Sequence, residues 1–299
     1  MKKTLINEYL NPETLSKISN LELRAKLVVE GFITGLHKSP FHGFSVEFSQ
    51  HRQYNPGDSL RFIDWKVYGR TDRFYIKQYE EETNLKAYIL LDISNSMSYS
   101  SSGISKIEYG KYLSAALSYL FLMQRDATGL CLFDSAIRKY VPPKSVNSYL
   151  QILITELENS IPGTDTDVGS VLHAMADRIK RRGLIIIISD LLDAPEKIIS
   201  GLRHFRHGGH EVLVFHLLDQ MERNFEFSGD IVFHDLESEE KIRTDPWFIK
   251  KEYQQNFNLY LDFIQKQCRE NRIDYKLIET KTSLDVALIE YLIKRNRLI

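Results

Sequence analysis

Oxygen-bearing side chains follow two apolar runs of this sequence, and their spacing could hold a metal ion. Asp92 ends the first run, and Ser94 and Ser96 follow it at alternate positions. Asp190 comes shortly after the second run, 184–188, which consists of one Leu and four Ile. Carboxylate and hydroxyl oxygens are the ligands that a hard divalent cation such as Mg²⁺ prefers in proteins.

A third loop offers further hydroxyl groups. Gly163 provides a turn and Thr164 follows it, with Asp165 and Thr166 as alternative ligands. The sequence therefore predicts a metal site formed by Asp92, Ser94, Ser96, Thr164 and Asp190. The three hydroxyls would bind the ion directly, and the two carboxylates directly or through water. Mg²⁺ is the expected ion, and Mn²⁺ and Ca²⁺ are alternatives because oxygen ligands suit all three.

Alternating strands and helices would position these loops. Apolar runs predict strands at 87–91, 128–133, 184–188, 211–217 and 275–278, with a hairpin at 225–234. Helical spacing of apolar residues predicts helices at 107–123, 149–157, 168–179, 195–205, 248–271 and 284–294. Repeated strand–helix units indicate an α/β fold with a doubly wound, mainly parallel sheet. In such sheets ligands bind at the carboxyl ends of the strands, where the three loops lie.

The first 84 residues have a different pattern. Residues 13–35 have one apolar face and predict a helix, and 41–82 are rich in aromatic residues with a turn at 54–58. We therefore expect a helix plus a β-rich subdomain over 1–84 and the α/β domain over 85–299. The mixed charges of the β-rich part favour an ion-pair network that holds it to the α/β core, or a docking surface for a partner.

The ordered set Asp92-x-Ser94-x-Ser96, Gly163-Thr164 and strand-end Asp190 resembles the metal-ion-dependent adhesion site (MIDAS) of von Willebrand factor A-type (vWA) domains. The resemblance implies a vWA, Rossmann-like fold, a bound metal and a role in protein interaction. An acidic residue of the partner would be attracted to the electrophilic ion. Many vWA domains have Gly after the last Asp, whereas this chain has Leu191.

The upstream stretches 43–52, 54–58, 61–66 and 69–71 resemble the bacterial "domain of unknown function 58" proteins. With the vWA motifs, this resemblance covers about residues 30 to 220. Members of that family are often encoded beside MoxR-type AAA+ ATPases. The resemblance therefore implies that the partner is such an ATPase, or its client, in chaperone-like assembly.

Composition narrows the remaining function classes. Lys and Arg number 39 against 40 Asp and Glu, a net charge of -1 that argues against a general nucleic-acid binder. The chain has two cysteines with no metal-type spacing, and its apolar runs are too short to span a bilayer. Since no signal peptide is evident either, we expect a cytoplasmic protein without a disulfide.

We expect a binding module and not an enzyme, with no catalytic residues. One alternative is a Mg²⁺-dependent phosphohydrolase with Asp92 as the nucleophile. However, Ser94 stands where haloacid-dehalogenase-type enzymes have a second Asp. Another alternative is a structural scaffold whose metal site stays empty.

Overall fold

The computed structural model describes most of the 299 residues in two compact units. The larger unit comprises residues 1–35 and 85–299, and the smaller unit comprises residues 36–84. The described residues are 12–16, 20–36, 51–53, 68–70, 74–77, 85–101, 103–163, 167–227, 231–234, 241–244 and 246–289.

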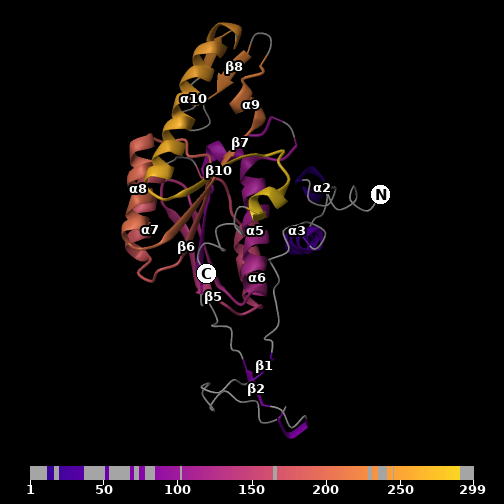
Figure 1. Cartoon of the computed structure of the whole chain (residues 1–299). Coiled ribbons are helices and arrows are strands. Elements are labelled where there is room, and N and C mark those ends of the chain that lie inside the picture. Colours follow the sequence, from indigo (N-terminus) through magenta and orange to yellow (C-terminus); the bar gives the residue numbers. More distant parts are fainter. Residues whose placement is uncertain are drawn as a thin grey trace. The chain divides into compact units, whose positions relative to one another are not determined.

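A six-stranded sheet forms the centre of the larger unit (Figure 1), with the strand order β10-β7-β6-β3-β4-β5. The strands are β3 (Lys86–Asp92), β4 (Ala127–Phe133), β5 (Ile137–Lys144), β6 (Leu184–Ser189), β7 (Glu211–Leu218) and β10 (Asp274–Glu279). Neighbouring strands are parallel except β4 and β5, which are antiparallel. The structure thus confirms an α/β fold with a mainly parallel sheet.

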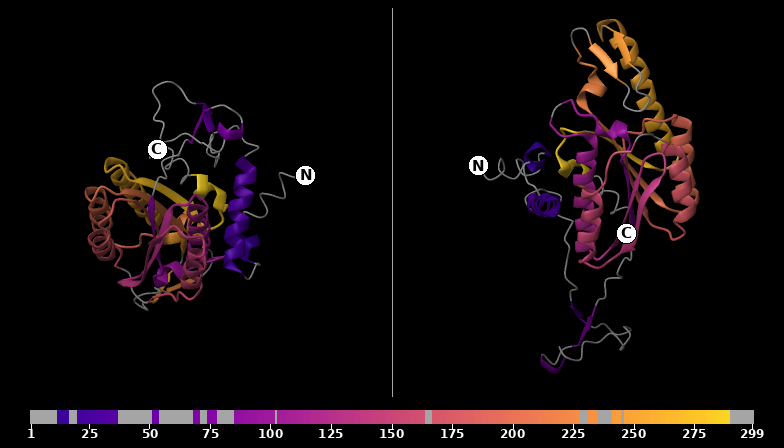
Figure 2. Two further views of the ribbon diagram at one scale, coloured as in Figure 1. Left: turned by 90° about the horizontal axis from the view of Figure 1, so that it is seen from below. Right: turned by 180° about the vertical axis from the view of Figure 1, so that it is seen from behind.

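Helices lie on both faces of this sheet (Figure 1 and Figure 2). One face is covered by α5, with α6 beside it, and the other by α7 and α8. The helices that follow β3 in the larger unit are α5 (Lys106–Met123), α6 (Tyr149–Glu158), α7 (Val168–Arg178), α8 (Pro195–His207), α9 (Gln220–Asn224) and α10 (Pro246–Glu270). A short 3₁₀ turn, η2 (Asn95–Ser98), follows β3, and residues 284–289 are helical. Most boundaries agree with the predicted ones within two residues, and residues 290–294 of the last predicted helix lie outside the described part.

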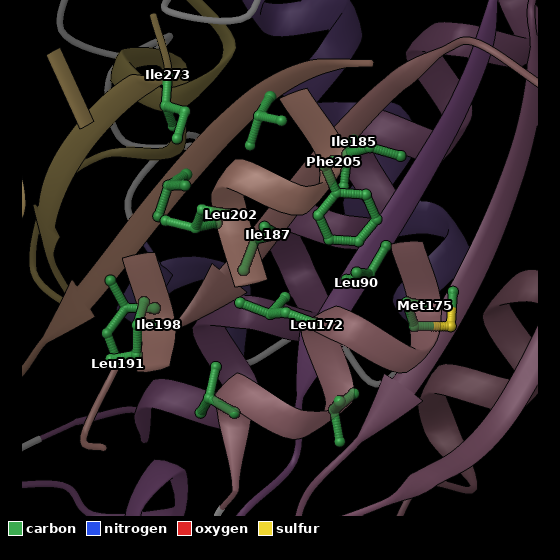
Figure 3. Packing of buried hydrophobic residues seen from close by; sticks show 14 of the residues in the cluster. Leu90, Leu172, Met175, Ile185, Ile187, Leu191, Ile198, Leu202, Phe205 and Ile273 are labelled. Atoms are coloured by element: carbon green, nitrogen blue, oxygen red, sulfur yellow. The ribbon is translucent and has the colours of Figure 1, made fainter. Parts of the chain in front are cut away.

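The core explains why the apolar runs became strands. Every residue of β6 is buried, as expected of a central parallel strand covered on both faces. On one face, Ile185 and Ile187 of β6 belong to the same buried cluster as side chains of α7 and α8 (Figure 3). The cluster thereby fixes the two strands whose ends carry the predicted metal ligands, β3 and β6.

The structure differs from the prediction in several elements. Strand β5 has no counterpart among the predicted elements. Within the predicted N-terminal helix the structure has α2 (Pro12–Ser16) and α3 (Leu21–Leu36), and Asn20 is not helical. The Asn20 side chain accepts a hydrogen bond from the Leu23 amide (2.8 Å) and caps α3.

The predicted hairpin at 225–234 is wrong in its pairing. Strand β8 (Ile231–His234) pairs antiparallel with β9 (Lys241–Thr244), and residues 225–227 are not in a strand. Phe225 instead ends α9 in the left-handed conformation, with φ 48°, and its ring packs against Tyr253 at 4.4 Å. Phe225, which the pattern assigned to a strand, therefore caps α9 and packs against α10 instead.

The smaller unit is described in three short segments. Strand β1 (His51–Gln53) pairs antiparallel with β2 (Tyr75–Lys77). Residues 68–70 are helical, and the Tyr68 and Phe74 rings stack with centroids 4.4 Å apart. The predicted turn at 54–58 and most of 41–82 lie outside the described residues.

None of the helices within the described ranges combines the length and apolar character needed to cross a membrane.

Candidate functional site

Asp92 is a fully buried carboxylate at the carboxyl end of β3. Its Oδ1 accepts a hydrogen bond from the Ser94 amide (2.9 Å), and its Oδ2 accepts one from Ser189 Oγ (2.6 Å). The parallel register, which pairs Leu91 with Ile188, brings the ends of β3 and β6 together. Burial, reinforced by the nearby Asp190, raises the pKa of Asp92 to about 7. The site therefore holds a carboxylate whose charge is costly unless a cation arrives.

Ser94 and Ser96 place two hydroxyl groups beside each other in the loop after β3. Their Oγ atoms are 3.0 Å apart, and Ser94 is fully buried. The turn is held by the Met97 amide, which donates to the Ser94 carbonyl (3.2 Å), and by the buried Met97 side chain. The structure therefore fixes the spacing of the two hydroxyls from the backbone.

Asp190 lies at the end of β6 and forms a buried ion pair that the sequence analysis did not predict. Its Oδ2 accepts a hydrogen bond from Lys106 Nζ (2.8 Å), and both side chains have 0% exposure. Lys106, in the first turn of α5, also donates to Glu222 Oε1 of α9 (2.5 Å). Burial alone would lower the pKa of Lys106, but the two carboxylates outweigh it and raise that pKa. Lys106 is therefore charged and neutralises Asp190.

The backbone after Asp190 adopts a conformation that usually favours glycine. Leu191 has a φ of 53° and is fully buried. Its amide donates to Ser189 Oγ (2.9 Å), and the Leu192 amide donates to Asp190 Oδ1 (3.3 Å). Leu191 thus takes the left-handed turn that Gly makes more easily, and the buried side chain offsets the cost.

The third predicted loop is anchored to the first at Gly163. The Gly163 amide donates to the carbonyl of Ile93, the residue between Asp92 and Ser94 (2.7 Å). A Cβ atom at Gly163 would lie 1.9 Å from Asp134 Oδ2, so this contact requires glycine. Thr164, with the alternatives Asp165 and Thr166, lies outside the described residues.

The structure thus brings together four of the five predicted residues, Asp92, Ser94, Ser96 and Asp190, at one edge of the sheet. Sequence reasoning missed Ser189, Lys106 and Glu222. The position of Ser189 directly before Asp190, at the end of a buried strand, was a usable signal. Nothing local marks Lys106. Within the described ranges, no group of three or more His, Cys, Asp or Glu residues is placed to hold a metal, so a metal here would depend on the serine hydroxyls.

An aromatic groove lies beside the Asp190 loop. Tyr260 of α10 donates a hydrogen bond to the Leu191 carbonyl. The rings of Tyr253, Phe257 and Tyr260 form a stacked series, with centroid distances of 5.5 and 6.3 Å. The groove is lined by Leu192, Asp193, Tyr253, Asn256, Phe257 and Tyr260. It therefore offers an apolar surface next to the polar loops.

Comparisons with known proteins identify the family of this chain, but the relatives that they find have no described activity. Proteins named "Uncharacterized protein Rv1480" from Mycobacterium tuberculosis and "Uncharacterized protein Mb1516" from Mycobacterium bovis are each 26% identical over 231 residues. These alignments cover 76% of this chain and 72% of each relative.

Two solved structures also resemble this chain. The "conserved hypothetical protein BatB" of Bacteroides thetaiotaomicron has a TM-score of 0.49 and 18% identity, covering 71% of this chain and 98% of its own. An "aerotolerance-related membrane protein" of Bacteroides fragilis has a TM-score of 0.49 and 20% identity, covering 71% and 97%.

A family model described as "Protein of unknown function DUF58" matches residues 50–258 of the 299. This match spans well over half of the sequence and includes both strand ends of the candidate site. The chain therefore belongs to the DUF58 family.

Proposed function

We propose that this chain is a vWA-type protein-interaction module whose Mg²⁺ site captures an acidic residue of a partner. The proposal rests mainly on the Asp92–Ser96 loop at the end of β3, where two hydroxyls stand beside a buried carboxylate. A MoxR-type AAA+ ATPase in the cytoplasm, or a client that it remodels, is the partner we propose. The choice of partner follows from the family resemblance.

The donor groups fit a small divalent cation. Adjacent ligands of an octahedral Mg²⁺ at about 2.1 Å are about 3.0 Å apart. This is the separation of Ser94 Oγ and Ser96 Oγ, 3.0 Å. Both oxygens of Asp92 already accept hydrogen bonds, which favours binding of Asp92 through water. The two serines would therefore hold the ion, with Thr164 as the proposed third hydroxyl.

The ion pair of Lys106 supports an anionic partner. Since Lys106 already neutralises Asp190 (2.8 Å), a bound ion would obtain its charge compensation chiefly from Asp92. When bound, the ion would supply an electrophilic position for a carboxylate from another molecule. The aromatic groove beside Leu192 would then contact the apolar residues that flank the acidic residue.

Capture from the native lysate tests this proposal. The immobilised chain would be presented in Mg²⁺, in EDTA, and as Asp92→Ala in Mg²⁺, with Ser170→Ala as a control on the exposed start of α7. We expect a partner that is retained by the wild type and by Ser170→Ala in Mg²⁺ and is lost in the other two samples. Equal capture in all four samples would overturn metal-bridged binding.

Two further results would favour the alternatives. Phosphatase turnover by the purified chain that disappears in Asp92→Asn would favour the phosphohydrolase. Absence of any Mg²⁺ binding at millimolar concentration would favour a scaffold with an empty site. Titration calorimetry and a phosphatase screen on the same protein decide between these results.

A further inference from the structure

A pair of histidines joins α7 to α8 on the face of the sheet away from α5. His173 Nδ1 and His204 Nδ1 are 3.0 Å apart, and the two ring centroids are 5.2 Å apart. Both side chains are partly exposed. At this separation one of the two nitrogens carries a proton and the other accepts it, so the pair shares a single proton.

The spacing of these nitrogens also suits a transition-metal ion. Two imidazole nitrogens at about 2.1 Å from one ion are about 3.0 Å apart when the angle at the ion is 90°, and about 3.4 Å apart when it is tetrahedral. The observed 3.0 Å between the Nδ1 atoms falls at the start of this range. The separation of the two nitrogens can therefore stay as it is when an ion binds, while the rings turn so that both lone pairs point at the ion.

Asp177 provides the second observation. It lies one turn after His173 on α7, and its Oδ1 is 3.7 Å from Nε2 of His204. A histidine that binds a metal through one nitrogen commonly directs its other N–H toward a carboxylate, which orients the ring. At 3.7 Å the two atoms are beyond hydrogen-bond distance, and a small rotation of the exposed Asp177 side chain would let it orient His204 in this way.

The two helices hold this arrangement rigidly. They approach so closely that a Cβ atom added to Gly169 would lie 2.6 Å from the Lys197 Cβ, and one added to Gly201 would lie 2.6 Å from the Leu172 Cβ. The residues next to the histidines, Leu172 and Phe205, are buried in the core cluster (Figure 3). The histidine backbones are therefore fixed before any ion arrives.

We propose that His173 and His204 form a binding site for a first-row transition-metal ion such as Zn²⁺, which Asp177 supports by orienting His204. The remaining coordination positions of the ion face solvent and are filled by water or by a donor from another molecule. When the ion binds both Nδ1 atoms, the proton between them moves to Nε2 of the ring that carried it, so each bound histidine stays a neutral imidazole. The site is independent of the proposed Mg²⁺ loops, whose oxygen ligands have a different preference.

A Zn²⁺ competition titration with a chromogenic chelator tests the proposal on the whole chain. The variants are His173→Ala, His204→Ala and Asp177→Asn. The matched control is His207→Ala, which removes an exposed histidine one turn further along α8. Asp92→Ala serves to show whether any Zn²⁺ binds at the loop site instead. Thermal unfolding without metal checks that each variant is folded.

We expect Zn²⁺ affinity to fall at least tenfold in each histidine variant and severalfold in Asp177→Asn, with no change in His207→Ala. Zn²⁺ binding that persists in Asp92→Ala belongs to the histidine pair. Nitrogen-15 spectra of the histidine rings would show both Nδ1 signals shifting with Zn²⁺. The proposal would be overturned by unchanged affinity in His173→Ala, by equal loss in His207→Ala, or by wild-type protein that binds no Zn²⁺ at micromolar concentration.

Discussion

Lys106 determines the charge balance of the candidate site, although it is not one of the predicted ligands. Its ammonium group is fully buried between Asp190 and Glu222. Removing two charges from water is expensive, and such a pair contributes less net stability than its short distances suggest. Removing only one partner of the pair is strongly destabilising, because the remaining charge stays buried without compensation.

Replacing Lys106 by Met should therefore destabilise the protein strongly. We expect the free energy of unfolding to fall by about 3–5 kcal/mol, since the buried Asp190 loses the cation that compensates its charge. Urea denaturation measures this loss. The control is Lys139→Met, which removes a half-exposed ammonium paired with Glu156 at 2.7 Å and should be nearly neutral. Similar losses in both variants would contradict the role given to burial.

Asp92 should make the metal-free protein less stable as the pH rises. Because burial raises its pKa to about 7, the folded state binds more protons than the unfolded state between about pH 4 and pH 7. The free energy of unfolding contributed by this group therefore falls as the pH increases through that window.

The neutral variant Asp92→Asn should remove this dependence. In EDTA at pH 8, we expect it to be more stable than the wild type by on the order of 2–4 kcal/mol, and the difference should shrink toward pH 4. Denaturation of both proteins at several pH values gives the difference directly and cancels the contribution of His216, a buried group whose lowered pKa acts in the opposite direction. A difference that does not change with pH would contradict the prediction.

The sequence predicts most of the residues of the site, but it does not predict the contacts that they make with distant parts of the chain. Asp92, Ser94 and Ser96 are close along the chain, so strand-end chemistry identifies them. Lys106 meets partners 84 and 116 residues away in sequence, and a lysine in the first turn of a helix usually faces solvent. Only the assembled sheet reveals that it is buried.

At the scale of elements, the loops of the site depend on one glycine. Gly163 binds the Ile93 carbonyl, and the space where its side chain would stand is filled by Asp134. Asp134 cannot easily move, because it accepts hydrogen bonds from the Ala136 amide (2.9 Å) and Arg138 Nε (2.6 Å). The loop that carries Thr164 therefore starts from a fixed point.

Gly163→Ala should destabilise the protein by about 1–3 kcal/mol, because the methyl group overlaps the Asp134 carboxylate. Thermal unfolding measures the change. Gly69→Ala is the matched control, since an added Cβ there has no neighbour within 4 Å in the described part of the chain, and it should have little effect. Equal unfolding temperatures for the wild type and Gly163→Ala would show that the loop can yield.

Secondary structure was predictable where the pattern was long and apolar. The parallel strands of the larger unit and its helices from α5 to α10, except the five-residue α9, follow from apolar runs and helical periodicity. Strand β5 was missed because Pro142 and Pro143 and several charged residues break its pattern. Its place at the edge of the sheet explains why prolines are tolerated there. Position in a sheet is a tertiary property that a local pattern does not contain.

At the scale of the whole molecule, the two cysteines report on the integrity of the core. Cys131 lies in β4 and Cys268 in α10, and both belong to the same buried cluster. Burial raises the pKa of each thiol to about 12. Since the thiolate is the reactive form, neither cysteine should react while the cluster is intact.

A thiol reagent such as 5,5′-dithiobis(2-nitrobenzoate) should therefore leave the native protein unmodified at pH 8. In denaturing urea we expect two thiols to react per chain, and any slow reaction in native buffer should proceed for both thiols at the rate of global unfolding. Absorbance of the released thionitrobenzoate follows the reaction. Rapid modification of one cysteine in native buffer would instead show that α10 opens separately from the sheet.

The order of the strands has a consequence for synthesis of the protein on the ribosome. Strand β10, which pairs with β7, follows the other five strands of this sheet in the sequence, and α10 precedes it. Until those residues are translated, a nascent chain that has already folded β3, β4, β6 and β7 presents β7 as an unpaired edge. Such an edge can pair with strands of other chains. Residues 246–279 therefore form the segment that covers the β7 edge, and ribosomes that stall before it would release an aggregation-prone product.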